Sequence, residues 1–390
     1  MRRAAWLFAL SACSFDKGQA VIDARGDGDA PDTKIDTPSG CRAVALDADG
    51  AHTCVARDDG SVRCWGKNGQ GELGRPPLSR DTCMITSVAY ACEKTPIDPM
   101  VPVAVTTLGL ADQHSCAIGG AKVYCWGAND SGQFGSGNNG DKYAPFEVTA
   151  RAGATEIAGG NTHTCSLASG TLSCSGGNNE GEVGNNSTAN AFTPYPSRNG
   201  VPTFGVGFQN VYALTISGDV YGWGDNALHQ IDSTATDPRT VPSQVPGITG
   251  ANAVAGGFGH ACAVLGNQTA ACWGSNGNGQ LGRGFASVSE GPGAVMVITG
   301  TINELSAGAN HTCVRRSDNT VACWGEGYLN GVVIALPRAA ARITSGSYHD
   351  CALLDDGTVW CWGSNPYGQL GNGTTNSSID NTAVQVPVCP

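Results

Sequence analysis

Residues 256–282 read GGFGHACAVLGNQTAACWGSNGNGQLG, and variants of this string make up seven copies along the chain. A fixed period of tens of residues indicates one supersecondary unit per copy, and the copies must stack to bury a common core. The repeat therefore predicts the architecture more directly than the length of 390 residues does. The copies are aligned on Trp-Gly, which starts at Trp65, Trp126, Ser175 (serine replacing tryptophan), Trp223, Trp273, Trp324 and Trp362.

Most of the seventeen cysteines fall in step with the repeat. Six copies read His-x-Cys, then eight or nine residues, then a second cysteine. Turn residues such as Asp58-Asp59-Gly60 lie between the two cysteines and predict a hairpin that places them opposite each other, about 4.5–5.5 Å apart at Cα. We therefore predict the disulfides Cys54–Cys64, Cys116–Cys125, Cys165–Cys174, Cys262–Cys272, Cys313–Cys323 and Cys351–Cys361.

The shorter spacing and the fourth copy both support this pairing. Between Cys116 and Cys125 the loop shrinks to the two residues Gly120-Ala121, so the cysteines still face each other. In the fourth copy Tyr212 and Gly222 replace both cysteines together, as a paired bond predicts.

Metal ligation is the alternative interpretation of His-x-Cys. No copy has a short Cys-x-x-Cys knuckle, so disulfides are favoured and no metal site is expected. We expect the repeat histidines to be hydrogen-bonded strand residues. They are His52, His114, His163, His260, His311 and His349.

The order of apolar strand, Gly-x-x-His-(Thr/Ser), hairpin, Trp-Gly-x-Asn and Gly-Gln-Leu-Gly resembles the regulator of chromosome condensation repeat over residues 41–390. The resemblance implies an all-β fold, a seven-bladed β-propeller of four-stranded antiparallel blades. Ser175 and the segment Glu326-Gly327-Tyr328-Leu329 depart from the pattern and place the local geometry of two blades in question.

A propeller must join its two ends, which suggests a role for the remaining cysteines. We predict that Cys41–Cys389 closes the ring, a bond worth about 5 kcal/mol in the loop-entropy model. Cys83 and Cys92 lie in the longest insertion, residues 75–103, and are predicted to pin it.

The amino-terminal segment has the pattern of an export signal. Arg2 and Arg3 precede a short apolar run, and Leu10-Ser11-Ala12-Cys13 resembles the lipobox of bacterial lipoproteins. The resemblance implies a signal peptide at 1–12, lipidation of Cys13 and an outer-membrane lipoprotein on the periplasmic or surface face. Residues 13–40 are acidic and poor in large apolar side chains, as in a flexible linker. An ordinary secretory signal is the alternative.

Composition and motifs exclude several function classes. The formal net charge is −11 and no basic stripe is present, so we expect no nucleic-acid partner. The chain has no Gly-x-Ser-x-Gly elbow, no His-Glu-x-x-His and no strand-to-helix phosphate loop, so we expect no enzyme activity and no cofactor.

We therefore predict a non-enzymatic, exported binding scaffold for a protein or envelope component, membrane-attached only through its lipid and monomeric. Alternatives are an inhibitor of the secreted β-lactamase-inhibitor type, an exchange factor for a small GTPase, and a hydrolase in the central channel. Apolar residues of the insertion and aromatic residues of other loops are the predicted partner contacts. They are Met84, Ile85 and Tyr90, followed by Phe134, Tyr143, Phe146, Phe192 and Tyr195.

Overall fold

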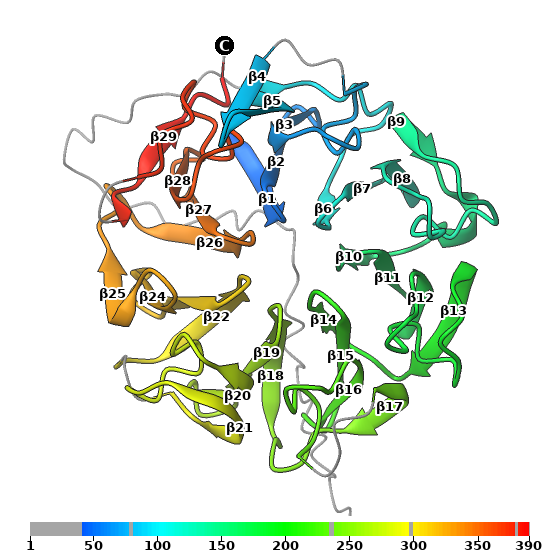
Figure 1. Cartoon of the computed structure of the whole chain (residues 1–390), viewed down its shortest axis with the longest axis vertical. Helices are drawn as coiled ribbons and strands as arrows, with labels where there is room; N and C mark the ends of the chain where they lie inside the picture. Colours follow the sequence, from blue (N-terminus) through cyan, green and yellow to red (C-terminus); the bar gives the residue numbers. More distant parts are fainter. Residues whose placement is uncertain (1–40, 78–80, 234–237, 296–298, 379–380, 390) are drawn as a thin grey trace, which may run out of the picture.

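The computed structural model describes residues 41–77, 81–233, 238–295, 299–378 and 381–389. In this part of the chain seven antiparallel sheets surround a common centre, like the blades of a propeller (Figure 1). This confirms the predicted all-β, seven-bladed fold. The predicted signal peptide, the linker and Cys13 lie outside the described residues. Among the described residues, no helix has the length and apolar character needed to cross a bilayer.

Each blade is formed by consecutive strands, and its first strand lies nearest the centre (Figure 1). Blade 1 contains β1 (Ala43–Asp49), β2 (His52–Arg57), β3 (Val62–Lys67), β4 (Asp81–Ile85) and β5 (Val88–Ile97). Blade 2 contains β6 (Thr107–Leu110), β7 (His114–Gly119), β8 (Lys122–Gly127) and β9 (Lys142–Glu147). Blade 3 follows the 3-10 helix η1 (Thr149–Arg151) and contains β10 (Glu156–Gly159), β11 (His163–Ala168), β12 (Thr171–Gly176) and β13 (Ala191–Asn199).

The remaining four blades have the same plan. Blade 4 contains β14 (Phe204–Val206), β15 (Asn210–Leu214), β16 (Val220–Gly224) and β17 (Arg239–Gln244). Blade 5 contains β18 (Ala251–Gly256), β19 (His260–Leu265), β20 (Ala270–Asn276) and β21 (Ser287–Ala294). Blade 6 contains β22 (Ile302–Ala307), β23 (His311–Arg316), β24 (Val321–Gly325) and β25 (Leu329–Ile334). Blade 7 contains β26 (Ala340–Ser345), β27 (His349–Leu354), β28 (Val359–Gly363) and β29 (Val384–Val386).

The hairpins between the second and third strands have the predicted turns. Gly60, with φ +80°, donates its N–H to the Arg57 carbonyl at 2.9 Å and closes a three-residue loop. In blade 2, Gly120 and Ala121 both take positive φ and form the two-residue loop. Cysteines face each other across these ladders in the six blades that have them.

All eight predicted cysteine pairs lie at disulfide distance. The six hairpin pairs have Cα separations of 4.0–4.1 Å, slightly below the expected range. Cys41 and Cys389 join the ends of the ring with a Cα separation of 5.5 Å. The ring is also closed by main-chain hydrogen bonds, such as that from the Ala43 N–H to the Gly357 carbonyl at 3.1 Å.

The insertion is a structured part of blade 1 rather than a separate loop. Cys83 and Cys92 bridge the β4–β5 hairpin, with a Cα separation of 5.9 Å. Because β5 pairs with β3, the spatial order is β1-β2-β3-β5-β4, and blade 1 has five strands instead of the four expected.

The Asn-x-x-Gly-(Gln/Glu)-apolar-Gly block forms a tight loop closed by its asparagine side chain. This Oδ1 accepts the N–H of the apolar residue five positions later, so the loop's own polar groups are satisfied inside the protein. The pairs are Asn68–Leu73 at 3.1 Å, Asn129–Phe134 at 2.9 Å, Asn178–Val183 at 2.8 Å, Asn226–Ile231 at 2.9 Å, Asn276–Leu281 at 3.1 Å and Asn365–Leu370 at 2.9 Å.

The hydrophobic core lies between neighbouring blades. Trp126 of blade 2 packs with Cys54 and Leu73 of blade 1, and Trp273 of blade 5 packs with Tyr212 of blade 4. The six repeat tryptophans are fully buried. Each blade therefore completes the core of the preceding one, which explains why a single repeat is not a stable unit.

Two departures from the repeat are compensated locally. Where Ser175 replaces tryptophan, the buried Arg151 guanidinium donates to the Ser175 hydroxyl at 2.6 Å and to the Ser166 hydroxyl at 2.7 Å. Where the fourth cysteine pair is missing, the Tyr212 ring occupies the space above Gly222. A Cβ on Gly222 would lie 3.2 Å from that ring, so the two replacements depend on each other.

Candidate functional site

Five of the six repeat histidines form a belt of contacts between neighbouring blades. Their Nε2 atoms lie within hydrogen-bond distance of the residue that follows the histidine position in the next blade. The contacts are His52–Ser115 at 2.8 Å, His114–Thr164 at 2.6 Å, His260–Thr312 at 2.9 Å, His311–Asp350 at 2.9 Å and His349–Thr53 at 2.7 Å. These contacts agree with the hydrogen-bonding role expected for the histidines. At the two other junctions the matching residues are Val211 and Ala261, which offer no hydroxyl.

Two of these hydroxyls also bind the Gly-(Gln/Glu)-apolar-Gly loop of the preceding blade. Ser115 Oγ donates to the Glu72 carbonyl at 2.8 Å, and Trp126 Nε1 donates to the same carbonyl at 2.7 Å. Thr312 and Trp324 donate to the Gln280 carbonyl in the same way. One loop carbonyl thus accepts two donors from the next blade, and every partner in this arrangement is buried.

Burial favours the neutral form of His52, His114, His163, His260 and His349. Loss of hydration lowers the pKa of His114 and His260 to about 3, and that of His163 and His349 to about 4. An imidazole with so low a pKa, away from solvent, is a poor general base at neutral pH. The five histidines that contact the next blade therefore serve the structure as hydrogen-bonding groups.

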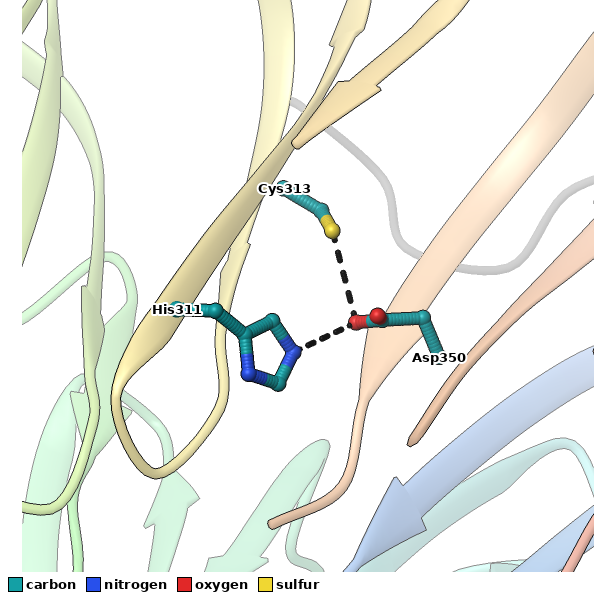
Figure 2. Close-up of side chains that lie close together, drawn as sticks. All are labelled: His311, Cys313 and Asp350. Carbon is teal, nitrogen blue, oxygen red and sulfur yellow. Dashed lines mark hydrogen bonds and ion pairs between the residues drawn. The ribbon is translucent and has the colours of Figure 1, made fainter. Parts of the chain in front are cut away.

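Among the described residues, His311, Cys313 and Asp350 form a buried group of three side chains of metal-ligating type, with their donor atoms within 4.8 Å of one another (Figure 2). Asp350 Oδ1 lies 2.9 Å from His311 Nε2 and 3.3 Å from Cys313 Sγ. The Tyr328 hydroxyl donates to the other carboxylate oxygen. Burial by itself would raise the pKa of Asp350, but the charge of His311 and the hydrogen bonds from His311 and Tyr328 lower it.

The cluster does not offer the donors of a metal or nucleophile site. Cys313 Sγ is bonded to Cys323 Sγ at 2.05 Å, so it supplies neither a thiolate ligand nor a nucleophile. His311 and Asp350 already bind each other in a site closed to solvent. The arrangement is a variant of the belt in which a carboxylate replaces the hydroxyl.

The predicted contact residues of the insertion lie on the surface of the β4–β5 hairpin. Met84 is 61% exposed and Tyr90 is 38% exposed, whereas Ile85 is half-buried. The Tyr90 ring makes an edge contact with Tyr367 of blade 7 at 5.5 Å between centroids. One side of the hairpin therefore packs on blade 7, and its other side remains open.

The predicted loop aromatics lie on outer strands instead. Tyr143 and Phe146 belong to β9, and Phe192 and Tyr195 belong to β13. The Tyr143 ring lies over Gly71 of blade 1, and the Phe192 ring lies over Gly132 of blade 2. A Cβ added to either glycine would lie only 2.6 Å and 2.4 Å, respectively, from these rings. Both side chains nevertheless stay exposed, 44% for Tyr143 and 40% for Phe192, so a partner contact at them remains a prediction.

Phe134 was wrongly placed among the surface contacts. Its side chain is fully buried, in a core cluster with Val123 and Ile157. Phe134 occupies the apolar position of the Gly-Gln-apolar-Gly loop, which is also buried at Leu73 in blade 1. The repeat pattern contained this signal, because the corresponding residue is apolar in the other loops of this type.

A ring of loops near the centre of the propeller carries exposed aromatics that sequence reasoning missed. Two residues in blade 1 and three in each other blade join the first and second strands, and main-chain hydrogen bonds link neighbouring loops at six of the seven junctions. In each bond the N–H of the first residue donates to the carbonyl of the second, at 2.8–3.3 Å. The pairs are Asp112–Gly160, Asn161–Phe208, Phe208–Gly257, Phe258–Ala309, Ala309–Ser347 and Ser347–Gly50. We call these linked turns the channel ring.

The side chains of the channel ring vary although its backbone repeats. Phe208 and Phe258 stack with their centroids 4.3 Å apart, and Phe258 is 47% exposed. Tyr348 is 53% exposed on the blade 7 loop. Two half-buried carboxylates lie here, Asp49 at the end of β1 and Asp112 in the blade 2 loop, and burial together with the charge of Asp112 raises the pKa of Asp49. The channel ring thus has an aromatic sector and an acidic sector.

Comparison with known proteins identifies the repeat. Two family models described as the regulator of chromosome condensation (RCC1) repeat match the chain. One covers residues 43–72, 302–330 and 341–369, and the other covers 121–167 and 356–389.

Two curated relatives are larger proteins. The human E3 ubiquitin-protein ligase HERC2 is 28% identical over 284 residues, which cover 70% of this chain and 6% of the ligase. The ultraviolet-B receptor UVR8 of Arabidopsis thaliana is 27% identical over 323 residues, covering 80% of this chain and 60% of the receptor. The chain thus spans less than two thirds of the length of these relatives.

Solved structures support the fold. Yeast RCC1 (Prp20) in complex with Kap60 superposes with a TM-score of 0.72 at 16% identity, covering 94% of this chain and 90% of that one. Human WBSCR16 superposes with a TM-score of 0.71 at 18% identity, covering 83% of this chain and 93% of that one. The chain therefore folds as a seven-bladed β-propeller of the kind seen in these structures, and the residues that the family models match resemble RCC1 repeats.

Proposed function

We propose that this protein is a non-enzymatic, protein-binding scaffold that is exported to an oxidising compartment and anchored to the bacterial cell envelope through Cys13. The observation that carries the binding role is the contrast within the channel ring. Its backbone is held by a repeated set of hydrogen bonds, whereas its side chains differ from blade to blade. A rigid frame with variable, exposed side chains is the usual arrangement of a recognition surface.

The cysteines support export. Eight disulfides in one chain form and persist in secreted or periplasmic environments and are rare in a reducing cytosol. The curated relatives named above are eukaryotic, so placement in a bacterial envelope rests on the lipobox-like residues 10–13 alone.

The buried polar groups support a scaffold over an enzyme. In the described part of the chain, the cluster most like a reactive site is His311, Cys313 and Asp350, and its groups are occupied by one another and by a disulfide. The exposed side chains Phe258 and Tyr348 of the channel ring are aromatic, and its carboxylate Asp112 is half-buried. They fit a protein partner that brings an apolar side chain to Phe258 and a basic one toward Asp112.

Site-specific photocrosslinking tests the binding surface. A crosslinking amino acid is placed at Phe258 or Tyr348 in cells that make the protein, with Ile216, which is 88% exposed on the β15–β16 turn, as the matched control. We expect a discrete crosslinked partner from the two channel-ring positions and none from Ile216. A partner that is a hydrolase would identify the inhibitor form of this function. Absence of a crosslinked protein at Phe258 and Tyr348, or equal labelling at Ile216, would contradict the proposal.

Metabolic labelling tests the anchor separately. We expect radioactive palmitate in the natural chain and none in the Cys13→Ser variant. An unlabelled natural chain would exclude lipid anchoring and leave the binding role to the crosslinking experiment.

A further inference from the structure

The β4 strand of blade 1 leaves a free edge on the rim of the propeller. It pairs with β5 on one side, and its other side borders no strand among the described residues. The pairing is regular from Asp81–Cys92 to Ile85–Val88, with no bulge. An edge of this kind presents a row of main-chain donors and acceptors to solvent.

The register shows which main-chain groups point outward. Thr86 and Ser87, both with positive φ, form a two-residue turn, so Ile85 and Val88 are a hydrogen-bonded pair. Hydrogen-bonded and non-bonded pairs then alternate along the hairpin, so Thr82 and Met84 direct their N–H and C=O groups away from β5. The Ala91 carbonyl confirms this assignment, because it accepts the Asn68 N–H of blade 1 at 3.0 Å and so faces away from Thr82.

The other outer strands are protected against strand addition in ways that β4 is not. Proline interrupts four of them, at Pro145 in β9, Pro194 and Pro196 in β13, Pro242 in β17 and Pro292 in β21. The β25 strand has a register shift and a glycine with φ +89°, and β29 has only three residues. Proline, bulges and shortness are the usual devices that prevent edge pairing. The β4 strand has none of these, and no lysine.

Charge favours a second copy of the chain at this edge. Residues 82–92 contain no charged side chain, although the whole chain has a net charge of −11. Two copies that pair through residues 82–92 therefore place no like charges of these segments opposite each other. Met84, 61% exposed, and Val88, 50% exposed, supply apolar surface.

We propose that β4 pairs antiparallel with β4 of a second copy of this chain, about a twofold axis at Cys83. Thr82 of each copy then lies opposite Met84 of the other. Their outward N–H and C=O groups make four main-chain hydrogen bonds, and the two blade 1 sheets become one continuous sheet. This dimer is independent of the channel ring and places two copies of that binding surface in one particle. It replaces the expectation of a monomer.

The molar mass of the oxidised full chain tests the proposal. Sedimentation equilibrium across the micromolar range is expected to show twice the mass of one chain. The Met84→Pro variant removes an N–H that β5 does not use, so the hairpin is retained and the dimer is lost. Met84→Thr keeps the N–H and is the matched control, with the dimer retained. A single-chain mass throughout, whatever else binds the edge, or a dimer unaffected by Met84→Pro, would overturn the proposal.

Hydrogen exchange on the natural chain provides a test that requires no variant. The amides of Thr82 and Met84 are expected to gain protection as the concentration rises, whereas those of Cys83 and Ile85 are protected at every concentration. A dimer in which the Thr82 and Met84 amides exchange freely would place the interface elsewhere and contradict the twofold pairing.

Discussion

The Asp350 carboxylate accepts a hydrogen bond from the Tyr328 hydroxyl of the preceding blade. At other blade junctions the direction is reversed, because the residue in the position of Asp350 is the donor. Elsewhere a hydroxyl such as Ser115 donates to a loop carbonyl of the preceding blade. Blade 6 lacks the Gly-Gln-Leu-Gly loop, so a hydroxyl at position 350 would lose that acceptor. An acceptor at 350 and a donor at 328 restore the bond.

Substitutions of Asp350 should separate the two bonds that its carboxylate accepts. Asp350→Thr keeps a partner for His311 but leaves the Tyr328 hydroxyl without its acceptor, and is expected to cost about 1–2 kcal/mol. Asp350→Ala loses both bonds and should cost about 3 kcal/mol. Urea unfolding of the oxidised protein measures both. Adding Tyr328→Phe to Asp350→Thr should recover part of the loss, and equal stability of the Thr and Ala variants would contradict the role exchange.

Arg151 is expected to stabilise blade 3 by replacing the missing tryptophan. Arg151→Ala removes buried hydrogen bonds to Ser166 and Ser175 and leaves a cavity, so it should lower the free energy of unfolding by about 3 kcal/mol. The double variant Arg151→Ala/Ser175→Trp should be more stable than the single one, because the other blades hold tryptophan there. An Arg151→Ala protein as stable as the natural chain would show that Arg151 does not compensate for the missing tryptophan.

Glu182 should make stability depend on pH. Burial, followed by the nearby charges of Glu180 and Asp225, raises its pKa to about 7. Because the folded pKa lies above the usual 4.5, the stability contributed by Glu182 is fully present below about pH 4.5. It is lost as the pH rises through 7. Glu182→Gln should therefore have little effect near pH 4.5 and stabilise by at most about 3 kcal/mol above pH 7.

Four other blades hold glutamine at this position, and their Oε1 accepts the same loop N–H at 2.8–2.9 Å. The substitution therefore keeps the loop intact. Thermal melts at several pH values measure the effect, with Glu180→Gln as the control for a simple change of charge. A stabilisation that does not vary with pH would exclude titration of Glu182 as the cause.

The fourth blade should accept the disulfide that it lacks. Tyr212 and Gly222 are directly opposed in the same register as the bridged cysteines. We expect Tyr212→Cys/Gly222→Cys to form a ninth bond, detected as the loss of two hydrogens by intact mass. The net gain in stability should be small, because the Tyr212 ring and its bond to the Gln230 carbonyl are lost. If the two introduced cysteines remain as free thiols in the double variant, the opposed register of residues 212 and 222 is contradicted.

Sequence reasoning succeeded where one local rule decides the outcome. The hairpin turns, the opposed cysteines and the joint loss at Tyr212 and Gly222 follow from strand alternation and turn chemistry. It failed where contacts between blades decide. Phe134 is buried because the next blade covers its loop. The channel-ring aromatics were missed because each lies in a short loop of its own repeat. Only the folded structure shows that these loops come together as one ring.

Disulfide mapping of the protein purified from its own host tests the central claim, that the recurrent chemistry builds an oxidised, closed propeller. Non-reducing peptide mass spectrometry is expected to find the eight pairs, including Cys41–Cys389, and no link in blade 4. Several free thiols among these sixteen cysteines, or bonds that join different blades other than Cys41–Cys389, would contradict it.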